Sequence, residues 1–372
     1  ALVGAGMFYR SYRNALAVAP GFDPHGVAMA SVSVTLAGYD SARAEQFLGD
    51  VAERVGREPG VTAVSYTDFP PLGIAGDSWE DLQVEGYTPP LTGNMKIERA
   101  AIGPDYFKVM RIPLVEGREF TAADDSAHAR AMIVNETFAR RYLAGRPALG
   151  VRVHGWGNWF TIVGVVQDVK THRVTDGAAP YFYVPVRQVF RHEYGYTFLA
   201  RTDRDVNTVA GEIARAVHAS APTVPVYAAM SLTDYVAGPL RTQEVAAQLL
   251  EVLSGVSLLL AAIGLYGMIA YLVARRTREF AVRVALGARR ADVARVVASQ
   301  AGGLLAAGIV AGVAGGIALG RAMQAVLFGV GPADAPVLAA AVLGMALVAF
   351  VATAIPARRA MRVDPMEALR AE

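Results

Sequence analysis

Three polar residues, Asp168, His172 and Asp176, lie close enough in the sequence to raise the question of a metal site. Carboxylates and imidazoles are common ligands of divalent metals. Their spacing matches no pair of ligands on one helical face, and they follow an apolar run typical of a strand. We therefore expect hydrogen-bonded loop groups here and no metal site.

The few lysines of the chain exclude a phosphate-binding P-loop. That site requires Gly-Lys-Ser/Thr after a glycine-rich turn, whereas the lysines at positions 96, 108 and 170 follow Met95, Phe107 and Val169. The chain therefore has no Walker A site for ATP hydrolysis. It contains no cysteine, which excludes disulfides and thiolate chemistry. No Gly-x-Ser-x-Gly motif indicates a hydrolase, so the sequence assigns no catalytic residue and no cofactor.

Three long stretches without a charged residue dominate the last third of the chain. Residues 252–274, 296–320 and 335–357 contain no Asp, Glu, Lys, Arg or His. At about 1.5 Å per residue, the shortest of them is about 34 Å long as a helix, and the hydrocarbon core of a bilayer is about 30 Å thick. The chain is therefore expected to be a membrane protein with these three spans.

The arginines give the orientation of the spans. Residues 275–295 hold seven arginines, and the tail 358–372 holds four, whereas the loop between the second and third spans holds only Arg321. Because short basic loops stay in the cytoplasm, we expect both basic segments inside and everything before Val252 outside. This basic charge lies beside the membrane, where it can contact lipid headgroups, and indicates no nucleic-acid surface.

The first residues resemble the end of another membrane helix. Leu2 to Tyr9 is apolar but too short to span, so we interpret residues 1–19 as the last turns of a truncated transmembrane helix emerging outside. A fragment of a signal peptide is the alternative. Arg10 and Arg13 follow on the outer side, weakly against the positive-inside rule, which a large translocated domain overrides.

Residues 20–240 predict an α+β outer domain. Val27–Leu36 indicates a strand, Ser41–Val55 a helix with Ser41 as its N-cap, and Val61–Tyr66 a second strand. The order recurs as a strand at 196–201, a helix at 206–218, a strand at 223–229 and a short helix from Ser231. The two β-α-β units thus form a discontinuous domain.

Between these units we expect a mainly β insert at about 90–190. Its predicted elements are strands at 99–102, 131–134, 151–153 and 160–166, a helix at 136–143, and a hairpin tip at 155–159. The expected fold is thus an α+β domain followed by an α-helical transmembrane domain, 241–372, with three complete spans and a truncated first span.

Several motifs resemble FtsX/MacB-like ABC transporter permeases. The segment that begins Thr277-Arg278-Glu279-Phe280 resembles the family's signature after a transmembrane helix. The other matching segments, in the order expected for the family, are Gly103–Phe107, Gly117–Phe120, Val134–Ala139, Ile162–Val166, Leu327–Val330, Pro356–Ala360 and Asp364–Leu369.

The resemblance covers essentially the whole chain and implies four spans per unit in a bacterial inner membrane. It places a periplasmic core domain, here 20–240, between the first span and the second. Leu327–Val330 points to large permeases in which the unit occurs twice, so we interpret the chain as the C-terminal unit of a duplicated permease. Implied partners are an ABC ATPase subunit, a second permease unit, and a periplasmic adaptor or cargo protein.

The cytoplasmic loop 275–295 is the expected contact with the ATPase. Glu279–Ala298 predicts an amphipathic helix whose apolar stripe could lie in a groove of that subunit. A helix lying on the lipid surface is the alternative. The coupling residues we predict are Glu279, Phe280, Arg283, Val284, Leu286, Gly287 and Ala288.

The second span carries a repeated glycine. Gly308, Gly312, Gly316 and Gly320 recur every four residues, which predicts a face where another helix approaches closely, within the unit or across a dimer. Substituting Gly312 by Leu is expected to disrupt assembly.

These features favour a permease that converts ATP-driven motion of its partner into a periplasmic conformational change, for export or extraction of a substrate. Because the spans contain no ionisable residue, they offer no polar path through the bilayer. Two alternatives stay open: an FtsX-type regulator of a periplasmic cell-wall hydrolase, and a membrane-anchored periplasmic binding or enzymatic module.

Overall fold

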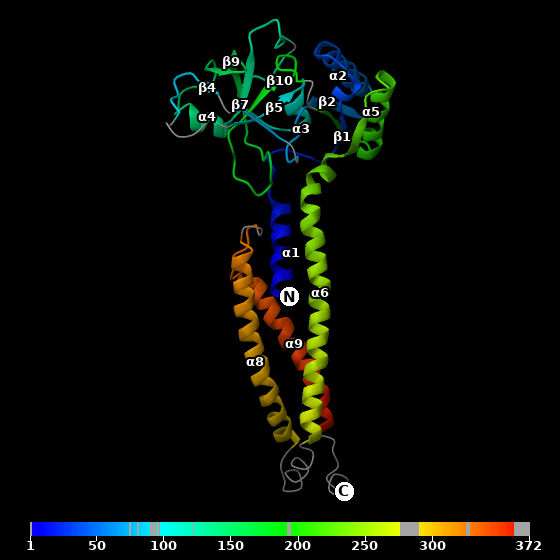
Figure 1. Cartoon of the computed structure of the whole chain (residues 1–372), viewed down its shortest axis with the longest axis vertical. Coiled ribbons are helices and arrows are strands. Elements are labelled where there is room, and N and C mark those ends of the chain that lie inside the picture. Colours follow the sequence, from blue (N-terminus) through cyan, green and yellow to red (C-terminus); the bar gives the residue numbers. More distant parts are fainter. Residues whose placement is uncertain are drawn as a thin grey trace. The chain divides into compact units, whose positions relative to one another are not determined.

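The computed structural model describes residues 2–73, 76–79, 82–89, 95, 97–121, 123–191, 195–275, 290–324 and 328–360. The chain divides into two compact units. We call Val18–Pro239 the outer domain, and Ala1–Ala17 with Leu240–Glu372 the helical unit (Figure 1).

A mixed twelve-stranded sheet organises the described part of the outer domain. Its strand order is β12-β1-β11-β2-β5-β10-β7-β9-β8-β4, with β3 paired to β5 and β6 to β9. The strands are β1 (Val27–Val32), β2 (Val61–Thr67), β3 (Asp77–Trp79), β4 (Gln83–Val84), β5 (Ile97–Ile102), β6 (Leu114–Gly117), β7 (Ala131–Asn135), β8 (Arg152–Gly155), β9 (Asn158–Val166), β10 (Tyr181–Pro185), β11 (Tyr196–Thr202) and β12 (Val226–Ser231). The helices are α2 (Ser41–Gly56), α3 (Tyr106–Met110), α4 (Glu136–Tyr142) and α5 (Val206–Ser220).

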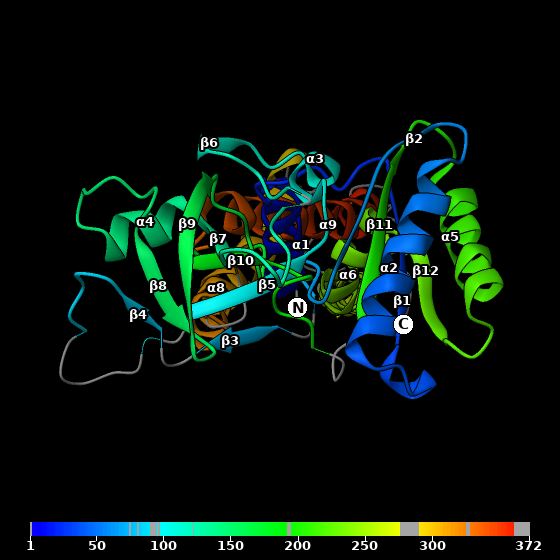
Figure 2. The ribbon, with the colours of Figure 1, turned by 90° about the horizontal axis from the view of Figure 1, so that it is seen from above.

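The two predicted β-α-β units interlock in the sheet. β11 lies between β1 and β2 and is antiparallel to both, while β1 lies between β11 and β12. The resulting order β12-β1-β11-β2 is that of a ferredoxin-like split β-α-β fold. Helices α2 and α5 pack together against these strands, as Figure 2 shows. We call this part the ferredoxin-like half.

The strands of the predicted insert continue the same sheet beyond β2, and we call them the insert half. β5 pairs β10 in parallel, and β7 pairs β9 in parallel. The predicted hairpin tip lies between β8 and β9, where Trp156 and Gly157 have φ values of 50° and 70°. Positive φ at both central residues is the requirement of the tight turns that match strand twist.

The seam between the two halves is narrow. β2 pairs β5 through Thr67 and Ile102 alone. Beyond this pair, Asp68 accepts a hydrogen bond of 2.8 Å from the amide of Ala101 and forms an ion pair with Arg99. Both charged side chains are fully buried. A buried charge is tolerated only with a partner, so this pair fixes the seam.

Apolar clusters cover both faces of the sheet. Because side chains alternate along a strand, Ala28 and Ala30 of β1 face the cluster under α2 and α5, and Val27 and Met29 face the opposite cluster around α3. Every residue of β1 is buried as a result.

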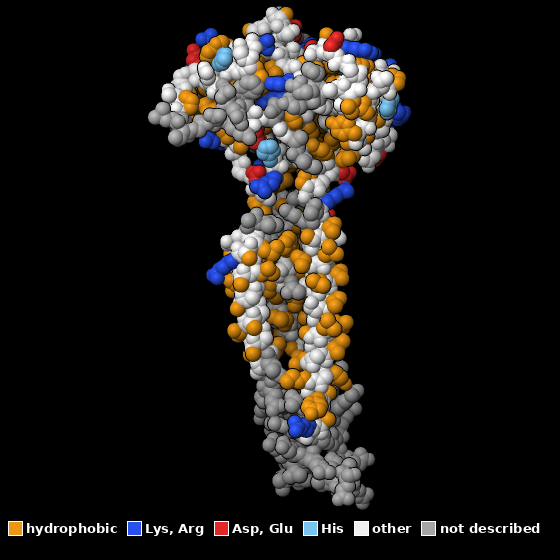
Figure 3. Space-filling view, viewed as in Figure 1, with side chains coloured by type: hydrophobic (Ala, Val, Ile, Leu, Met, Phe, Trp, Pro, Cys, Tyr) orange, Lys and Arg blue, Asp and Glu red, His pale blue; other side chains and the backbone are white. Residues whose placement is uncertain are grey.

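Four helices form the described part of the helical unit: α1 (Leu2–Ala17), α6 (Leu232–Arg275), α8 (Arg290–Ala322) and α9 (Ala335–Ala360), of which α6 begins within the outer domain. Within α6, α8 and α9, the segments 244–275, 305–322 and 335–354 are long and apolar enough to cross a membrane. Figure 3 shows hydrophobic side chains along these helices and charged side chains over the outer domain. The exposed apolar surface suits a lipid environment.

The first helix runs from Leu2 to Ala17, past the apolar run and within the predicted segment 1–19. Other predictions of element bounds were wrong. Asp40, not Ser41, caps α2, since its carboxylate accepts from the amide of Arg43.

The helix predicted to be short from Ser231 is the start of α6, which continues through Pro239 into the first of the long apolar segments. Strand β1 ends at Val32 instead of Leu36, and a 3-10 turn occupies Thr35–Ala37. No helix was predicted at α3, and no strand was predicted at β3, β4, β6 or β10.

The buried seam pair predicts a strong effect of Asp68→Asn. The amide keeps the shape of the carboxylate but removes its negative charge from the buried ion pair with Arg99, and breaking a buried pair from one side costs about 3–5 kcal/mol. Urea unfolding of the full chain in detergent measures this loss. Glu53→Gln, which breaks the exposed ion pair with Arg57 on α2, serves as control and should change nothing measurable. Equal stabilities of the two variants would contradict the assignment.

Candidate functional site at the entry to the outer domain

The segment Val18–Gly26 carries the chain from α1 into β1, and we call it the entry segment. It contains neither helix nor strand, yet its backbone is bonded to both halves of the sheet. The bonds are Lys170 N to Pro20 O at 2.8 Å, Asp23 N to Met110 O at 2.9 Å, and Thr202 N to Gly26 O at 2.8 Å. Thr202 belongs to the ferredoxin-like half, Lys170 lies in the loop after β9 of the insert half, and Met110 ends α3, which packs against β2 and β11.

Arg201, on β11, ties this segment down further. Its side chain is only 9% exposed. Its Nε donates to the carbonyl of Val109 at 2.6 Å, and its two terminal nitrogens donate to the carbonyls of His25 and Asp23 at 2.9 and 2.8 Å. The fixed fork of the guanidinium suits several acceptors at once. One side chain of the ferredoxin-like half thus holds the entry segment together with α3.

Close packing leaves the entry segment little freedom. Gly21 has φ of +86°, and a Cβ there would lie 2.4 Å from the carbonyl oxygen of Asp168. Only glycine fits such a backbone at this distance. The next residue, Phe22, is buried in the apolar cluster around α3.

Neighbouring groups lower the pKa of Asp23 in the entry segment. Partial burial raises the pKa of Asp23, but hydrogen bonds from His25 and the charges of Arg201 and Arg111 lower it more, so the pKa lies below its ordinary value of 3.8. A depressed carboxyl pKa contributes stability above that ordinary value and loses it as the pH falls through the folded pKa. The ion pair is therefore fully formed at neutral pH.

The start of α6 is bonded to the same segment. Thr233 Oγ1 donates to the carbonyl of Pro24 at 3.2 Å. Ser231 caps the helix by accepting from the amide of Asp234 at 3.0 Å, and Leu232 is fully buried in the cluster around α3. The residues that follow α1 and those that begin α6 are therefore tied together within the outer domain.

The three polar residues singled out in the sequence have separate partners. Asp168 accepts from the amide and the hydroxyl of Thr137 at the start of α4, at 2.8 and 2.7 Å. His172 pairs with Glu98 at 2.5 Å, and Asp176 with Arg173 at 3.1 Å. They are hydrogen-bonded loop groups, as expected. Among the described residues no three such side chains are grouped to hold a metal.

Comparison with known families decides the identity. The family model of the MacB-like periplasmic core domain matches residues 14–216, more than half of the chain, and the model of the FtsX-like permease C-terminal region matches residues 251–365. The chain belongs to the FtsX/MacB-like family of ABC transporter permeases.

Curated relatives agree with this family. The pyoverdine export ATP-binding/permease protein PvdT of Pseudomonas entomophila is 28% identical over 70% of this chain and 41% of its own length. The macrolide export ATP-binding/permease protein MacB of Wolinella succinogenes is 26% identical over 73% of the chain and 43% of its own length. The uncharacterized ABC transporter permease YknZ of Bacillus subtilis is 27% identical over 73% of this chain and 69% of its own length. The chain thus spans about two fifths of the length of the two export proteins.

Among solved structures, the periplasmic region of MacB from Actinobacillus actinomycetemcomitans aligns with 57% of this chain and 92% of that region. The identity is 16% and the TM-score is 0.40.

The predicted coupling residues of the permease, from Glu279 to Ala288, lie outside the described residues. The helix predicted at 279–298 therefore has a described part only from Arg290, and that part belongs to α8. Of the cytoplasmic tail predicted at 358–372, the part after Ala360 also lies outside the described residues.

The four glycines of α8 have different surroundings within the helical unit. A Cβ on Gly316 would lie 2.9 Å from the side chain of Val3, and one on Gly320 would lie 2.8 Å from the carbonyl oxygen of Pro332. At Gly312 the nearest described atom is 3.8 Å away, and at Gly308 none lies within 4 Å. The outer end of the glycine face is thus in close contact with α1.

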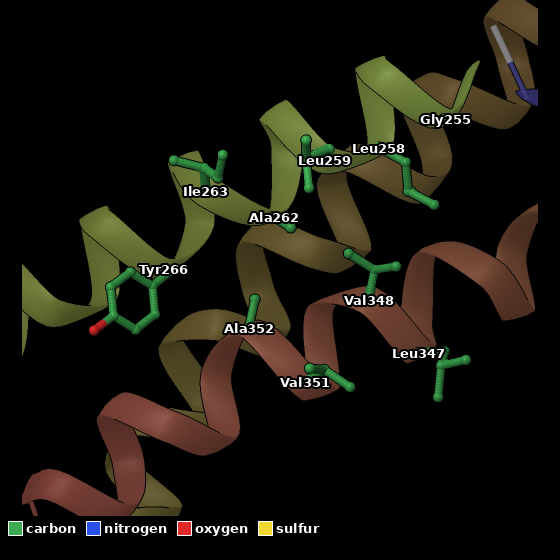
Figure 4. Close-up of a pocket in the computed structure, with 10 residues that line it drawn as sticks. All are labelled: Gly255, Leu258, Leu259, Ala262, Ile263, Tyr266, Leu347, Val348, Val351 and Ala352. Carbon is green, nitrogen blue, oxygen red and sulfur yellow. The ribbon is translucent and has the colours of Figure 1, made fainter. Parts of the chain in front are cut away.

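An apolar groove of about 550 Å³ lies between α6 and α9. Figure 4 shows its lining, in which Leu258, Ile263 and Tyr266 of α6 approach Val348 and Val351 of α9. None of the ten lining residues is charged. Such a surface accommodates lipid chains but supplies no group for catalysis.

Sequence reasoning missed Arg201 as a site residue. A signal existed, because Arg201 is the one charged residue in the strand Tyr196–Thr202, whose every residue is buried. A charge in a buried strand indicates a specific partner.

The bonds of Arg201 predict that Arg201→Gln frees the entry segment. The shorter amide cannot reach three carbonyls, and each buried acceptor left without a donor costs about 1–3 kcal/mol. Hydrogen exchange of the full chain should therefore show the amide of Asp23 exchanging at least about tenfold faster. Arg204→Gln, which breaks the more exposed pair with Glu212, is the matched control. Unchanged exchange in Arg201→Gln would refute the role.

The glycine surroundings predict a difference between Gly316→Leu and Gly308→Leu. The first forces a side chain into Val3 and should destabilise the helical unit by about 1–3 kcal/mol. The second points into open space and should leave the stability unchanged. Thermal unfolding in detergent compares the two variants, and equal melting temperatures would argue against a tight contact with α1.

Proposed function

We propose that the chain is the permease subunit of an ABC transporter complex in a bacterial inner membrane. It converts the ATP-driven motion of a partner ATPase into a conformational change of its periplasmic domain, which exports or extracts a substrate. The observation that carries this proposal is a set of hydrogen bonds within the outer domain. They tie the entry segment to the sheet, to α3 and to the start of α6.

The contacts of the entry segment support a mechanical role. A displacement of the end of α1 acts directly on Pro20, Asp23 and Gly26, whose backbone bonds lead into both halves of the sheet. Strand pairing between the halves consists of Thr67 and Ile102, flanked by two backbone hydrogen bonds, Gly103 N to Tyr66 O and Asp68 N to Ala101 O, and by the buried Asp68–Arg99 ion pair. The halves therefore change their relative position about this seam when the entry segment moves.

Motion enters from the cytoplasmic side through the loop 275–295 in this proposal. Phe280, Val284 and Ala288 would contact the ATPase, with the surrounding arginines at the rim of the contact. The relatives PvdT and MacB are named as ATP-binding/permease proteins, names that join an ATP-binding part to a permease part. In this proposal the ATPase is a separate subunit. A second permease unit completes the complex.

The working surface lies in the periplasmic domain. The described parts of the candidate spans within 252–274, 305–320 and 335–354 contain no ionisable residue, so they form no polar path for a substrate. Names of relatives refer to export of pyoverdine and macrolides. A periplasmic lipoprotein, lipid, peptide or small molecule, passed on with a periplasmic adaptor, is the class of cargo we propose.

One crevice of the outer domain is too small to be the substrate site of an enzyme. It lies among Tyr66, Asp124 and Arg187 and has a volume of about 20 Å³. That is room for about one water molecule, and hence for no organic substrate.

The proposal predicts that reversing the charges of the coupling loop separates the permease from its ATPase. Glu279→Lys combined with Arg283→Glu keeps the net charge of the loop but exchanges the signs at these two positions. The wild type should co-purify with a candidate ATPase subunit and support ATP turnover in nanodiscs. The double variant should do neither.

The control for this experiment is Glu53→Arg with Arg57→Glu, which reverses an exposed pair of the same spacing on α2. It should leave association and turnover unchanged. Failure of the wild-type permease to associate with any ATPase would refute coupling and leave an anchored periplasmic module.

A further inference from the structure

A second groove of the helical unit differs from the apolar one because charged residues line it. It has a volume of about 790 Å³ and lies between α1, α6 and α9. Much of its wall consists of small or apolar residues: Leu2, Ala5, Gly6, Ala17, Gly255, Pro336, Val337, Ala340 and Ala341. Arg10, Arg13, Asn14 and Glu251 also line it.

Contacts at the outer end of α1 fix the groove in place. Arg10 forms an ion pair of 2.6 Å with Asp334, just before α9. Asn14 donates to the carbonyl of Gly329 at 2.9 Å, and Ser11 Oγ accepts from the amide of Phe328 at 2.8 Å. The groove is thus preformed by the packing of the helical unit, and Asp334 neutralises the charge of Arg10.

Arg13 has no such neutralising partner in the described part of the chain. It is exposed, lines the groove, and stands on the side of the membrane where arginine is disfavoured. Glu251 of α6 is also exposed and lines the same groove without a described ion pair. The groove therefore offers one cation and one anion to a ligand.

The course of the helices brings these two charges toward each other. Tyr12 of α1 hydrogen-bonds Glu244 of α6, whereas Leu2 shares a wall with Ser254 and Leu258. The two helices are therefore antiparallel. Because side chains lean toward the N-terminus of their own helix, Arg13 and Glu251 lean toward one another along the groove.

A third polar group lies deeper in the same wall. Ser254 is 3% exposed, and its hydroxyl has no hydrogen-bond partner among the described residues. It lines this groove and the neighbouring one. A buried hydroxyl without an acceptor is costly in a lipid environment, so this position adds polarity to the wall beneath the two charges.

We propose that this groove binds a phospholipid whose headgroup carries both a phosphate and a primary amine, such as phosphatidylethanolamine. Arg13 binds the phosphate, since a guanidinium matches phosphate oxygens, and Glu251 binds the ammonium. The acyl chains lie along the small residues of α1 and α9. A purely anionic headgroup fits less well because Glu251 repels it. This site goes beyond the proposed coupling to an ATPase and does not depend on it.

Native mass spectrometry of the full chain tests the site. The protein is equilibrated in micelles with equal amounts of phosphatidylethanolamine and phosphatidylglycerol, and the retained lipid is counted. Wild type should retain phosphatidylethanolamine in preference. Arg13→Gln should lower retention of both lipids about fivefold, the effect of one arginine near a headgroup. Glu251→Gln should abolish the preference without lowering retention of phosphatidylglycerol.

Two further variants keep the outcome unambiguous. Arg321→Gln removes another exposed outer arginine, outside the groove, and should change nothing. Gly255→Leu adds a side chain where no described atom lies within 4 Å, so the protein should fold while its groove loses the lipid. Retention unaffected by Arg13→Gln and Glu251→Gln would overturn the proposal. So would a disulfide between copies through Ala340→Cys, because a second copy would then occupy the groove.

Discussion

The outer domain depends on one guanidinium that holds three backbone carbonyls. Arg201 joins the carbonyls of Asp23 and His25, in the entry segment, to that of Val109 in α3. The bond to Val109 is buried and the other two are part-buried, so losing the arginine would leave the Val109 carbonyl without this donor in a site that water does not reach. The entry segment is therefore bonded in place within the outer domain, and in the proposed function motion at the end of α1 acts on the sheet through these bonds.

The sheet to which the entry segment is bonded is itself divided. Strong pairing within the ferredoxin-like half and within the insert half contrasts with the single pair between Thr67 and Ile102. The buried ion pair of Asp68 and Arg99 helps to hold the halves together, because separating two buried charges costs free energy. In the proposed function, this seam is where the two halves change their relative position.

The sequence predicted the features that depend on local patterns. A charge within hydrocarbon is so costly that the charge-free stretches alone predicted three apolar helices, and the burial of Phe47 and Val51 follows the helical period of α2. Strand β10 was missed because its residues, from Tyr181 to Pro185, show no alternation when both faces are buried. The bonds of Arg201 could not be predicted, since Arg201 and its acceptor Asp23 are 178 residues apart and no local signal specifies which loop a buried arginine binds.

The distance between the two halves during ATP turnover tests the central claim most directly. Because the chain has no cysteine, spin labels can be placed uniquely on Leu36→Cys, at a side chain 78% exposed, and on Trp159→Cys, at one 46% exposed. In the complex with its ATPase, the distance distribution between them should shift between the nucleotide-free and ATP-trapped states. The shift should vanish in Arg201→Gln while ATP turnover continues. An identical distribution in both states of the otherwise unaltered labelled protein would contradict the account.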